Sequence, residues 1–127
     1  MKKIGLTGGI GAGKSYIAKI FETLFVPVFY ADEEAKKILN EAITIQEVSQ
    51  ALQTDILDKE TGLANRKKIA SIVFESPDKL MLLNQIIHPK VEQNFQLWCK
   101  QFIHQKYVIK EAAILFESES YKNLDGV

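Results

Sequence analysis

The N-terminal part of the chain alternates between short apolar runs and helical patterns. The run Lys3–Thr7 is apolar and leads into a cluster of glycines, which predicts a buried strand ending in a tight loop. From Lys14 to about Leu24 apolar side chains recur at helical spacing, and Pro27–Tyr30 predicts a second short strand. Asp32 is expected to cap the helix that follows. This alternation predicts an α/β fold with a parallel sheet flanked by helices.

The middle of the chain carries helical patterns. Thr44–Glu47 matches a capping box, which predicts a helix that begins there and runs to about Leu52. Asp55–Asn65 is polar and predicts a connection. Asn65 is expected to cap the next helix, whose apolar face would include Ile69.

Two prolines divide the following segment. Ser76 with Pro77 predicts the start of another helix, and this helix should stop near His88 because the residue before Pro89 disfavours helical geometry. Pro89 is then expected to open a separate helix with an apolar stripe that packs into the core: Val91, Phe95, Trp98 and Phe102. A third strand is predicted from Tyr107, continued by the apolar run from Ala112 to Phe116.

Composition excludes several classes of protein. The 127 residues carry no net charge, which argues against a protein whose main task is to grip nucleic acid, and 46% of them are hydrophobic, which argues against disorder. The single cysteine, Cys99, cannot form an internal disulfide. Neither a membrane-spanning run nor a secretory signal is visible, so a cytoplasmic protein without a membrane partner is expected.

Residues 8–15 read GGIGAGKS and match the phosphate-binding pattern G-x-x-x-x-G-K-[ST] in full. Glycines let the backbone N–H groups point inward at phosphate oxygens, and the N-terminus of the following helix adds positive charge. Lys14 is placed to reach the β- and γ-phosphates, and the Ser15 hydroxyl to bind Mg²⁺. The motif predicts binding of a nucleoside triphosphate by Gly8, Gly9, Gly11, Ala12, Gly13, Lys14, Ser15 and Tyr16.

Two acidic residues follow predicted strands. Asp32 comes just after the second strand, at the end that faces the ligand crevice in open α/β sheets. It either accepts a proton from an attacking hydroxyl or merely caps its helix. Glu111 resembles the strand-end acid that assists Mg²⁺ in P-loop enzymes, but Lys110 interrupts the apolar run, so an exposed strand-end charge is the alternative.

Other polar residues have simpler interpretations. His88 has no metal-ligand neighbours at suitable spacing, so it is expected to be a capping or packed residue on composition alone. Cys99 is expected to be a buried, inert thiol. The lysine pairs Lys36–Lys37 and Lys67–Lys68 are expected to lie on solvated helix faces.

Taken together, these residues resemble the dephospho-coenzyme A kinase family over the whole chain. The opening IGLTGGIGAGKS is close to the family's LTGGIGSGKS signature, and Asp32 falls on the family's acid in YADEEAKKIL. Arg66 falls on its helix-start arginine in ANRKKIASIVF, His88 on the histidine of LNQIIHP, and Glu117 on the acid of ILFE.

The resemblance implies phosphoryl transfer from ATP, with Mg²⁺, to the ribose 3′-hydroxyl of dephospho-coenzyme A. It implies that Asp32 is the base and Lys14 a second catalytic residue, with Thr7, Asp32, Arg66, His88 and Glu117 on the acceptor side and Ser15 and Glu111 at the metal. It also implies a P-loop NTPase-type sheet built from residues 1–31 and 105–127, with a helical acceptor-binding insertion at about 32–104.

The chain departs from the family pattern at several positions. Tyr30 stands where many members have a first aspartate, Tyr16 replaces a threonine, and Glu111 and Ala113 occupy a D-x-P motif. Family members continue past Val127 into a lid with arginines and further strands, so a C-terminal truncation with an unpaired edge on the first strand is expected. A nucleotide-binding fragment without turnover and a P-loop kinase for another small acceptor are the alternative functions.

Overall fold

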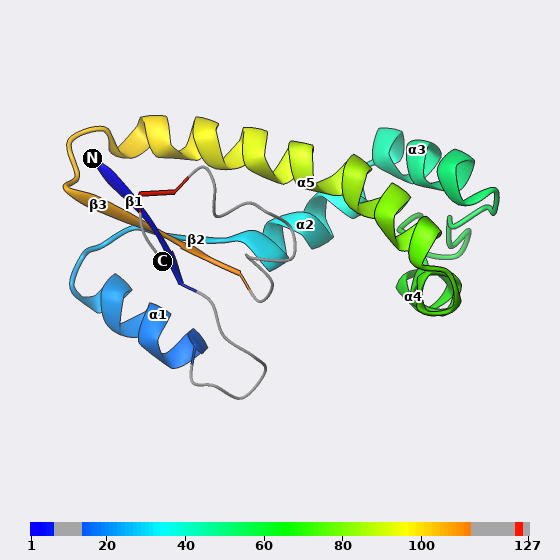
Figure 1. Ribbon diagram of the computed structural model, residues 1–127, viewed down its shortest axis with the longest axis horizontal. Coiled ribbons are helices and arrows are strands. Elements are labelled where there is room, and N and C mark those ends of the chain that lie inside the picture. The colour runs from blue at the N-terminus through cyan, green and yellow to red at the C-terminus, as the bar shows by residue number, and fades with distance from the viewer. Residues whose placement is uncertain (7–13, 113–123, 126–127) are drawn as a thin grey trace. The chain divides into compact units, whose positions relative to one another are not determined.

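The computed structural model describes residues 1–6, 14–112 and 124–125, and helices and strands alternate through its first part (Figure 1). The elements in chain order are β1 (Lys2–Leu6), α1 (Lys14–Thr23), β2 (Val28–Tyr30), α2 (Ala31–Leu39), α3 (Ala42–Leu52), α4 (Arg66–Glu75), α5 (Pro77–Cys99), the 3₁₀ helix η1 (Lys100–Phe102) and β3 (Tyr107–Glu111). The chain divides into two compact units. We call Met1–Glu34 with Val91–Val127 the sheet unit, and Ala35–Lys90 the helical unit.

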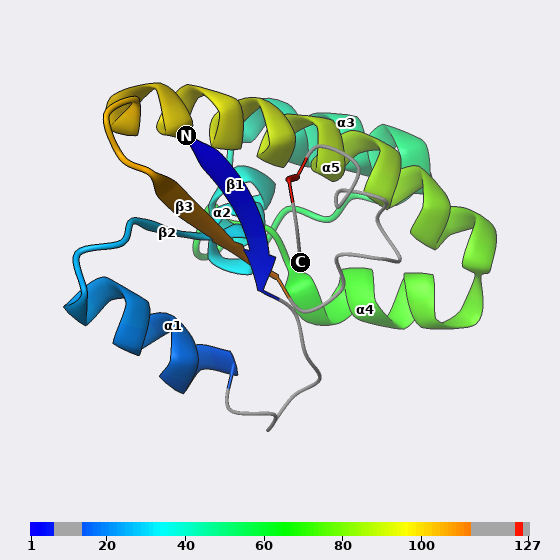
Figure 2. The ribbon, with the colours of Figure 1, turned by 60° about the vertical axis from the view of Figure 1, so that its left-hand side comes forward.

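The sheet unit is built on three parallel strands in the order β1-β3-β2. Lys2 pairs with Tyr107 and Leu6 with Glu111, while Tyr30 pairs with Glu111 from the other side. The sheet lies between α1 on one face and the C-terminal part of α5 on the other (Figures 1 and 2). The parallel α/β sheet predicted from the sequence is therefore confirmed.

The outer edge of β1 is hydrogen bonded at Lys3. The N–H of Asp125 donates to the carbonyl oxygen of Lys3 at 2.7 Å, and the N–H of Lys3 donates to Asp125 Oδ2 at 2.7 Å. The segment 124–125, red in Figures 1 and 2, lies beside β1 in both views. The edge expected to be unpaired is therefore occupied at this position.

An aromatic cluster fills the space between β2 and α5. The ring centroid of Phe29 lies 5.2 Å from that of Phe95 and 5.4 Å from that of Trp98, and Trp98 lies 4.8 Å from Phe102. Phe95 is fully buried and Phe29 is 5% exposed. The apolar stripe predicted for this helix therefore packs into the core, as expected, and Cys99 beside it is also buried.

The alternative of an exposed strand-end charge at Glu111 is wrong, because Glu111 is 5% exposed, and the preceding Lys110 is buried as well. Its side chain is 2% exposed, and Nζ lies 2.8 Å from Glu92 Oε2 on α5. The same ammonium lies 4.7 Å from the ring centroid of Phe95. A buried lysine is tolerated here because a carboxylate and an aromatic face compensate its charge.

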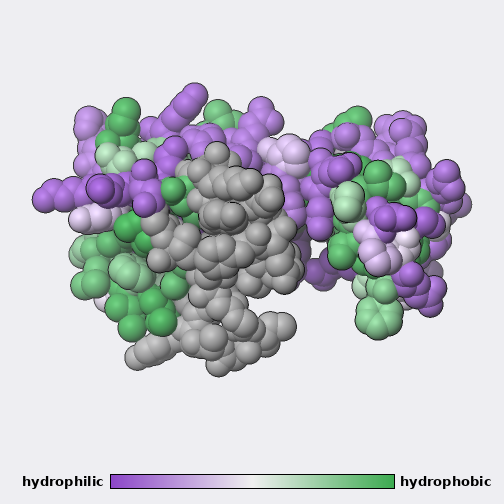
Figure 3. Space-filling view, viewed as in Figure 1, coloured by the Kyte–Doolittle hydropathy of each residue, from purple (hydrophilic) through white to green (hydrophobic). Residues whose placement is uncertain are grey.

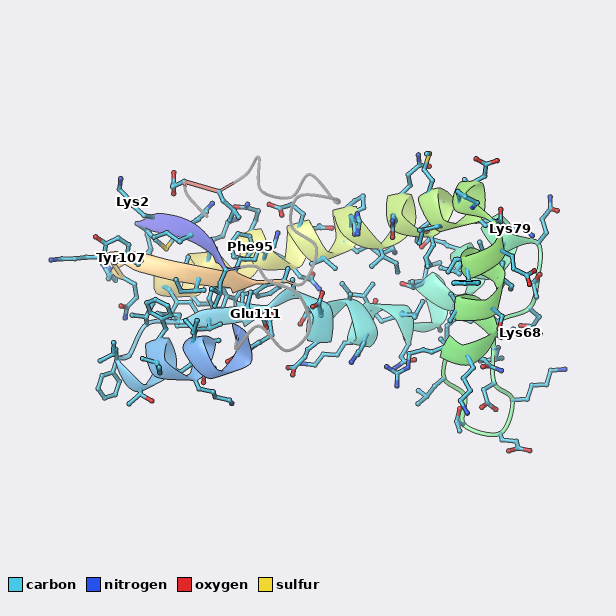
Figure 4. The ribbon with its side chains drawn as sticks, turned by 60° about the horizontal axis from the view of Figure 1, so that its bottom comes forward. Lys2, Lys68, Lys79, Phe95, Tyr107 and Glu111 are labelled. Atoms are coloured by element: carbon cyan, nitrogen blue, oxygen red, sulfur yellow. The ribbon has the colours of Figure 1, made fainter. Side chains whose placement is uncertain are left out.

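The helical unit has its own apolar core. The buried residues that form this core cluster come from α3, the following connection and α4: Ile45, Val48, Leu52, Ile56 and Ile69. Asn65 caps α4 as predicted, because its Oδ1 accepts a hydrogen bond from the N–H of Lys68 at 3.1 Å. The lysine pairs on α2 and α4 are exposed, as expected; Lys68 is labelled in Figure 4.

Two predicted helix starts were wrong. α3 begins at Ala42 with Glu41 as the N-cap residue, and the N–H of Ile45 donates to the carbonyl of Glu41 at 2.9 Å. Thr44 therefore lies inside the first turn, where its side chain is buried rather than capping. α2 begins at Ala31, so Asp32 lies in the first turn and is not the cap. Thr44 lies on the buried face of α3 with Ile45 and Val48, so packing outweighs the capping-box pattern that predicted a helix start at Thr44.

The predicted helix break at Pro89 was also wrong. α5 runs without interruption from Pro77 to Cys99, with Pro89 inside it. Ser76 does cap this helix, since its Oγ accepts from the N–H of Lys79 at 3.3 Å. Ile87 and Val91 on either side of the proline are buried, and this packing outweighs the loss of one helical hydrogen bond. Within the described ranges, none of the helices is long and apolar enough to span a membrane.

Candidate active site at the carboxyl ends of the strands

The glycine-rich motif is framed by the two elements that a phosphate-binding loop requires. β1 ends at Leu6 and α1 begins at Lys14. The predicted backbone contacts of Thr7, Gly8, Gly9, Gly11, Ala12 and Gly13 lie outside the described residues. Lys14, Ser15 and Tyr16 form the first turn of α1, so the N-terminal end of that helix follows the motif directly. The strand-to-helix context predicted for the motif is confirmed.

Glu111 occupies the centre of the sheet edge at which all three strands end. It pairs in register with Leu6, the residue before the motif, and with Tyr30, two residues before Asp32. Figure 4 shows Glu111 at the opposite end of β3 from Tyr107. Glu111 is 5% exposed, and Asp32 is half-buried in the first turn of α2. Both acidic residues thus follow strand ends beside the motif, where ligands bind in open α/β sheets.

Tyr30 adds a feature that the sequence did not predict. Its hydroxyl donates a hydrogen bond to the carboxylate of Glu22 on α1. Burial, this hydrogen bond and the nearby carboxylates of Glu22, Glu111 and Glu33 hold the pKa of Tyr30 well above its usual value. Tyr30 therefore stays a neutral hydrogen-bond donor even at alkaline pH values where a solvent-exposed tyrosine loses its proton. No residue spacing links a tyrosine on a strand to a glutamate on the preceding helix, so local pattern analysis had no signal for this pair.

The acidic residues suit Mg²⁺ held partly by phosphate. Mg²⁺ usually keeps several waters and takes one or two carboxylates together with substrate phosphates. Glu111 supplies a carboxylate at the sheet edge, and the described residues contain no group of three or more His, Cys, Asp or Glu that would form an all-protein metal cage. The donor set therefore fits Mg²⁺ brought with a nucleotide better than a resident metal.

The remaining predicted site residues lie elsewhere in the chain. Arg66 is the first residue of α4 and is exposed, and His88 is half-buried in α5. Both belong to the helical unit, whereas Asp32 and Glu111 belong to the sheet unit. Glu117 lies outside the described residues. Burial raises the pKa of the Cys99 thiol, which agrees with the inert role expected for it.

A parallel sheet whose first strand leads through a complete phosphate-binding motif into a helix, with acids at the neighbouring strand ends, defines a P-loop nucleotide-binding fold. The family model for dephospho-CoA kinase matches residues 2–127. The chain therefore belongs to the dephospho-CoA kinase family, and the resemblance seen in the sequence is confirmed. A kinase family implies the use of ATP.

Individual relatives support the same assignment. A dephospho-CoA kinase of Leptospira interrogans is 42% identical over 124 residues, covering 97% of this chain and 59% of its own length. A dephospho-CoA kinase of Chlorobaculum tepidum is 35% identical over 130 residues, covering 98% of this chain and 62% of its own. The chain thus spans about 60% of the curated relatives it matches.

Two solved structures share the fold. The structure of dephospho-CoA kinase from Campylobacter jejuni superimposes with a TM-score of 0.74 at 27% identity, and that of TT1252 from Thermus thermophilus with a TM-score of 0.77 at 26% identity. Each match covers 98% of this chain and 62% of the other.

Proposed function

We propose that this chain carries the nucleotide-binding part of a dephospho-CoA kinase, which phosphorylates the ribose 3′-hydroxyl of dephospho-coenzyme A in the cytoplasm. The observation that carries the proposal is the register of Glu111 with Leu6 and Tyr30, since it brings an acid and the start of the phosphate-binding motif to one sheet edge. Family membership supplies the substrates, ATP and dephospho-coenzyme A.

In the proposed reaction the 3′-oxygen of the acceptor forms a bond to the γ-phosphorus, and the bond from that phosphorus to the bridging oxygen breaks to leave ADP. The backbone of the glycine motif and Lys14 bind the phosphates, and Ser15 and Glu111 would hold Mg²⁺, which neutralises phosphate charge. Asp32 accepts the proton of the attacking hydroxyl. Thr7, Arg66, His88 and Glu117 are the proposed acceptor-side residues.

A second candidate is nucleotide binding without turnover. Phosphoryl transfer commonly uses arginine to stabilise charge in the transition state. Arg66 is the only arginine of this chain, and it is exposed on α4 in the helical unit. A P-loop kinase for another acceptor is the third candidate, and the identity of the acceptor separates it from the first.

The experiment that tests these candidates is ADP formation by this chain with ATP and Mg²⁺, with and without dephospho-coenzyme A. Circular dichroism on the same sample reports whether the chain is folded, and equilibrium dialysis reports ATP binding. ADP that depends on dephospho-coenzyme A supports the first candidate. ATP binding by a folded chain that forms no ADP supports the second. A folded chain that neither binds ATP nor forms ADP contradicts the nucleotide site itself.

A further inference from the structure

A groove of about 470 Å³ runs beside β2 in the sheet unit, and nothing in the proposed reaction uses it. Since β2 is an end strand of the described sheet, this groove lies along a sheet edge rather than at the strand ends. Its lining includes Glu22, Phe25, Tyr30, Trp98, Phe102 and Gln105. The volume is within the range of small-molecule sites, about 300–1,000 Å³.

Trp98 and Phe102 form the aromatic wall of the groove, and buried rings pack against Trp98. Trp98 and Phe102 lie 4.8 Å apart at an interplanar angle of 53°. Behind them, Phe29 and Phe95 are 5% and 0% exposed, and the Phe29 ring lies 5.4 Å from that of Trp98. Because the buried rings fix Trp98, the aromatic part of the groove lining is preformed.

Phe25 contributes a further ring at the end of α1. Its backbone has a φ of 61°, a left-handed conformation that bulky residues rarely adopt, and its side chain is 87% exposed. Hydrophobic residues gather over the part of the molecule where α1 lies (Figure 3), and they include Ile17, Ile20 and Leu24. This conformation belongs to the end of α1, where the N–H of Val26 donates to the carbonyl oxygen of Phe21 at 2.9 Å, and it leaves the Phe25 ring exposed at the groove.

One positively charged group already lies against this aromatic cluster. The ammonium of Lys110 lies 4.7 Å from the centroid of Phe95. The groove is lined by Trp98 and Phe102, which extend the same cluster along α5 and η1. Rings of this kind attract cations through their negative faces, and tryptophan does so most strongly.

The charges at the groove are complementary to a cation. Glu22 is the single charged side chain among the described residues that line it. Burial and the hydrogen bond to Glu22 raise the pKa of Tyr30, and the neighbouring carboxylates of Glu22, Glu111 and Glu33 add to this increase. Aromatic faces with one carboxylate are the chemistry that recognises organic cations.

We propose that this groove binds a quaternary ammonium group. The rings of Trp98 and Phe102 would lie on one side of the cation, and the carboxylate of Glu22 on the other. A guanidinium would bring five N–H donors that need acceptors, whereas a quaternary ammonium brings none. The Glu22 carboxylate already accepts a hydrogen bond from Tyr30, and Tyr30 and Gln105 are the other described lining residues with a side-chain oxygen, so the lining side chains offer few acceptors. The geometry therefore favours the cation that needs no hydrogen bonds. The proposal does not depend on kinase activity.

The test uses the intrinsic fluorescence of Trp98, the single tryptophan of the chain. Tetramethylammonium chloride and choline chloride are titrated into the full chain at constant ionic strength. The neutral isostere of choline, 3,3-dimethylbutan-1-ol, and guanidinium chloride at low concentration are titrated in parallel. We expect a saturable change with the two quaternary ammonium salts, with a dissociation constant of about millimolar order, since the exposed cation–π contacts are individually weak.

Variants separate recognition from folding. Glu22→Gln keeps the size of an exposed side chain and should weaken binding by about threefold or more, as removal of an electrostatic partner from a partly solvated site does. Phe102→Leu should weaken it by a similar factor, about threefold, through loss of one ring. Glu41→Gln, an exposed carboxylate in the helical unit, is the matched control and should bind as the unchanged chain does.

Several results would overturn the proposal. They are absence of saturation, equal binding of the neutral isostere, tighter binding of guanidinium, or unchanged affinity in Glu22→Gln. Circular dichroism identifies any variant that fails to fold, and the exposed position of Glu22 keeps that variant informative if Phe102→Leu does not fold.

Discussion

Lys110 Nζ lies 2.8 Å from Glu92 Oε2 and joins the central strand β3 to α5. The other oxygen of Glu92 accepts from Gln96 Nε2 at 2.7 Å, and Gln96 Oε1 accepts from Lys3 Nζ at 2.7 Å. A single series of hydrogen bonds therefore links β3, α5 and β1. Such pairs contribute little net stability compared with well-packed apolar residues, but the loss of one partner alone is costly.

We expect Lys110→Met to lower the free energy of unfolding by about 2–4 kcal/mol, because Glu92 would keep a charge without its partner. Urea denaturation followed by circular dichroism measures this change. The double variant Lys110→Met with Glu92→Leu should recover part of the loss, since no charge remains unpaired. Lys106→Met, at an exposed position, is the control. A loss no larger than that of the control would contradict the role of the pair.

Tyr30 should make the stability of the fold depend on alkaline pH. Its pKa in the folded chain is raised above the usual value of 10.0, so the folded state binds the proton more tightly than the unfolded state does. The stabilisation is complete below pH 10.0 and is lost as the pH rises above it toward the folded pKa. Urea denaturation at two pH values, one on each side of pH 10.0, should show this loss, and Tyr30→Phe should remove the part that Tyr30 causes. An identical alkaline loss in Tyr30→Phe would contradict the assignment.

Replacing Asp32 tests the proposed base. If the chain forms ADP with dephospho-coenzyme A, Asp32→Asn should slow that reaction by about 100-fold or more, because the amide cannot accept the proton. ATP binding should remain unchanged. Glu33→Gln removes an exposed carboxylate from the same helical turn and serves as the control. Full turnover in Asp32→Asn would contradict the proposal that Asp32 is the base.

Replacing Lys14 tests the phosphate site. Lys14→Ala should weaken ATP binding by about tenfold or more, as expected for the loss of a charged hydrogen-bond partner. Equilibrium dialysis with ATP and Mg²⁺ measures the effect. Lys19→Ala removes a lysine from the same helix at an exposed position and should leave binding unchanged. Equal affinities in the two variants would argue against a phosphate contact by Lys14.

Much of the sheet unit could be predicted from short-range patterns. A strand before the glycine motif, a helix after it and a parallel sheet all follow from local alternation, and the structure has each of them. The placement of Glu111 and Asp32 after strand ends was also predictable, because parallel strands end at one sheet edge. The cap at Asn65 was predictable from the local sequence, because asparagine is a preferred N-cap residue.

The wrong predictions concern positions where packing outweighs a local signal. Pro89 usually marks a helix boundary, yet the buried neighbours Ile87 and Val91 carry α5 through it. Thr44 fits a capping box, but its side chain is buried in the helical unit. Which side chains are buried depends on contacts between distant segments, and these do not appear in a local pattern.

The contacts of Lys110 and Tyr30 also join different helices and strands. Glu92, on α5, lies 18 residues before Lys110. Tyr30 meets Glu22 across the turn between α1 and β2. In each case the sequence shows one residue of the pair but not its partner, so the alternative of an exposed strand-end charge and the view of Tyr30 as a simple departure from a family motif were reasonable interpretations.

Asp125 also bears on how the molecule meets its neighbours in solution. A strand from a second molecule that paired with β1 at Lys3 would compete for the N–H and the carbonyl oxygen of that residue, and both are already hydrogen bonded to Asp125. The added strand would also have to displace the carboxylate of Asp125, and charged groups at the edge of a sheet oppose the pairing of further strands. The carboxylate of Asp125, which takes the place of a main-chain acceptor, thus disfavours such pairing at Lys3.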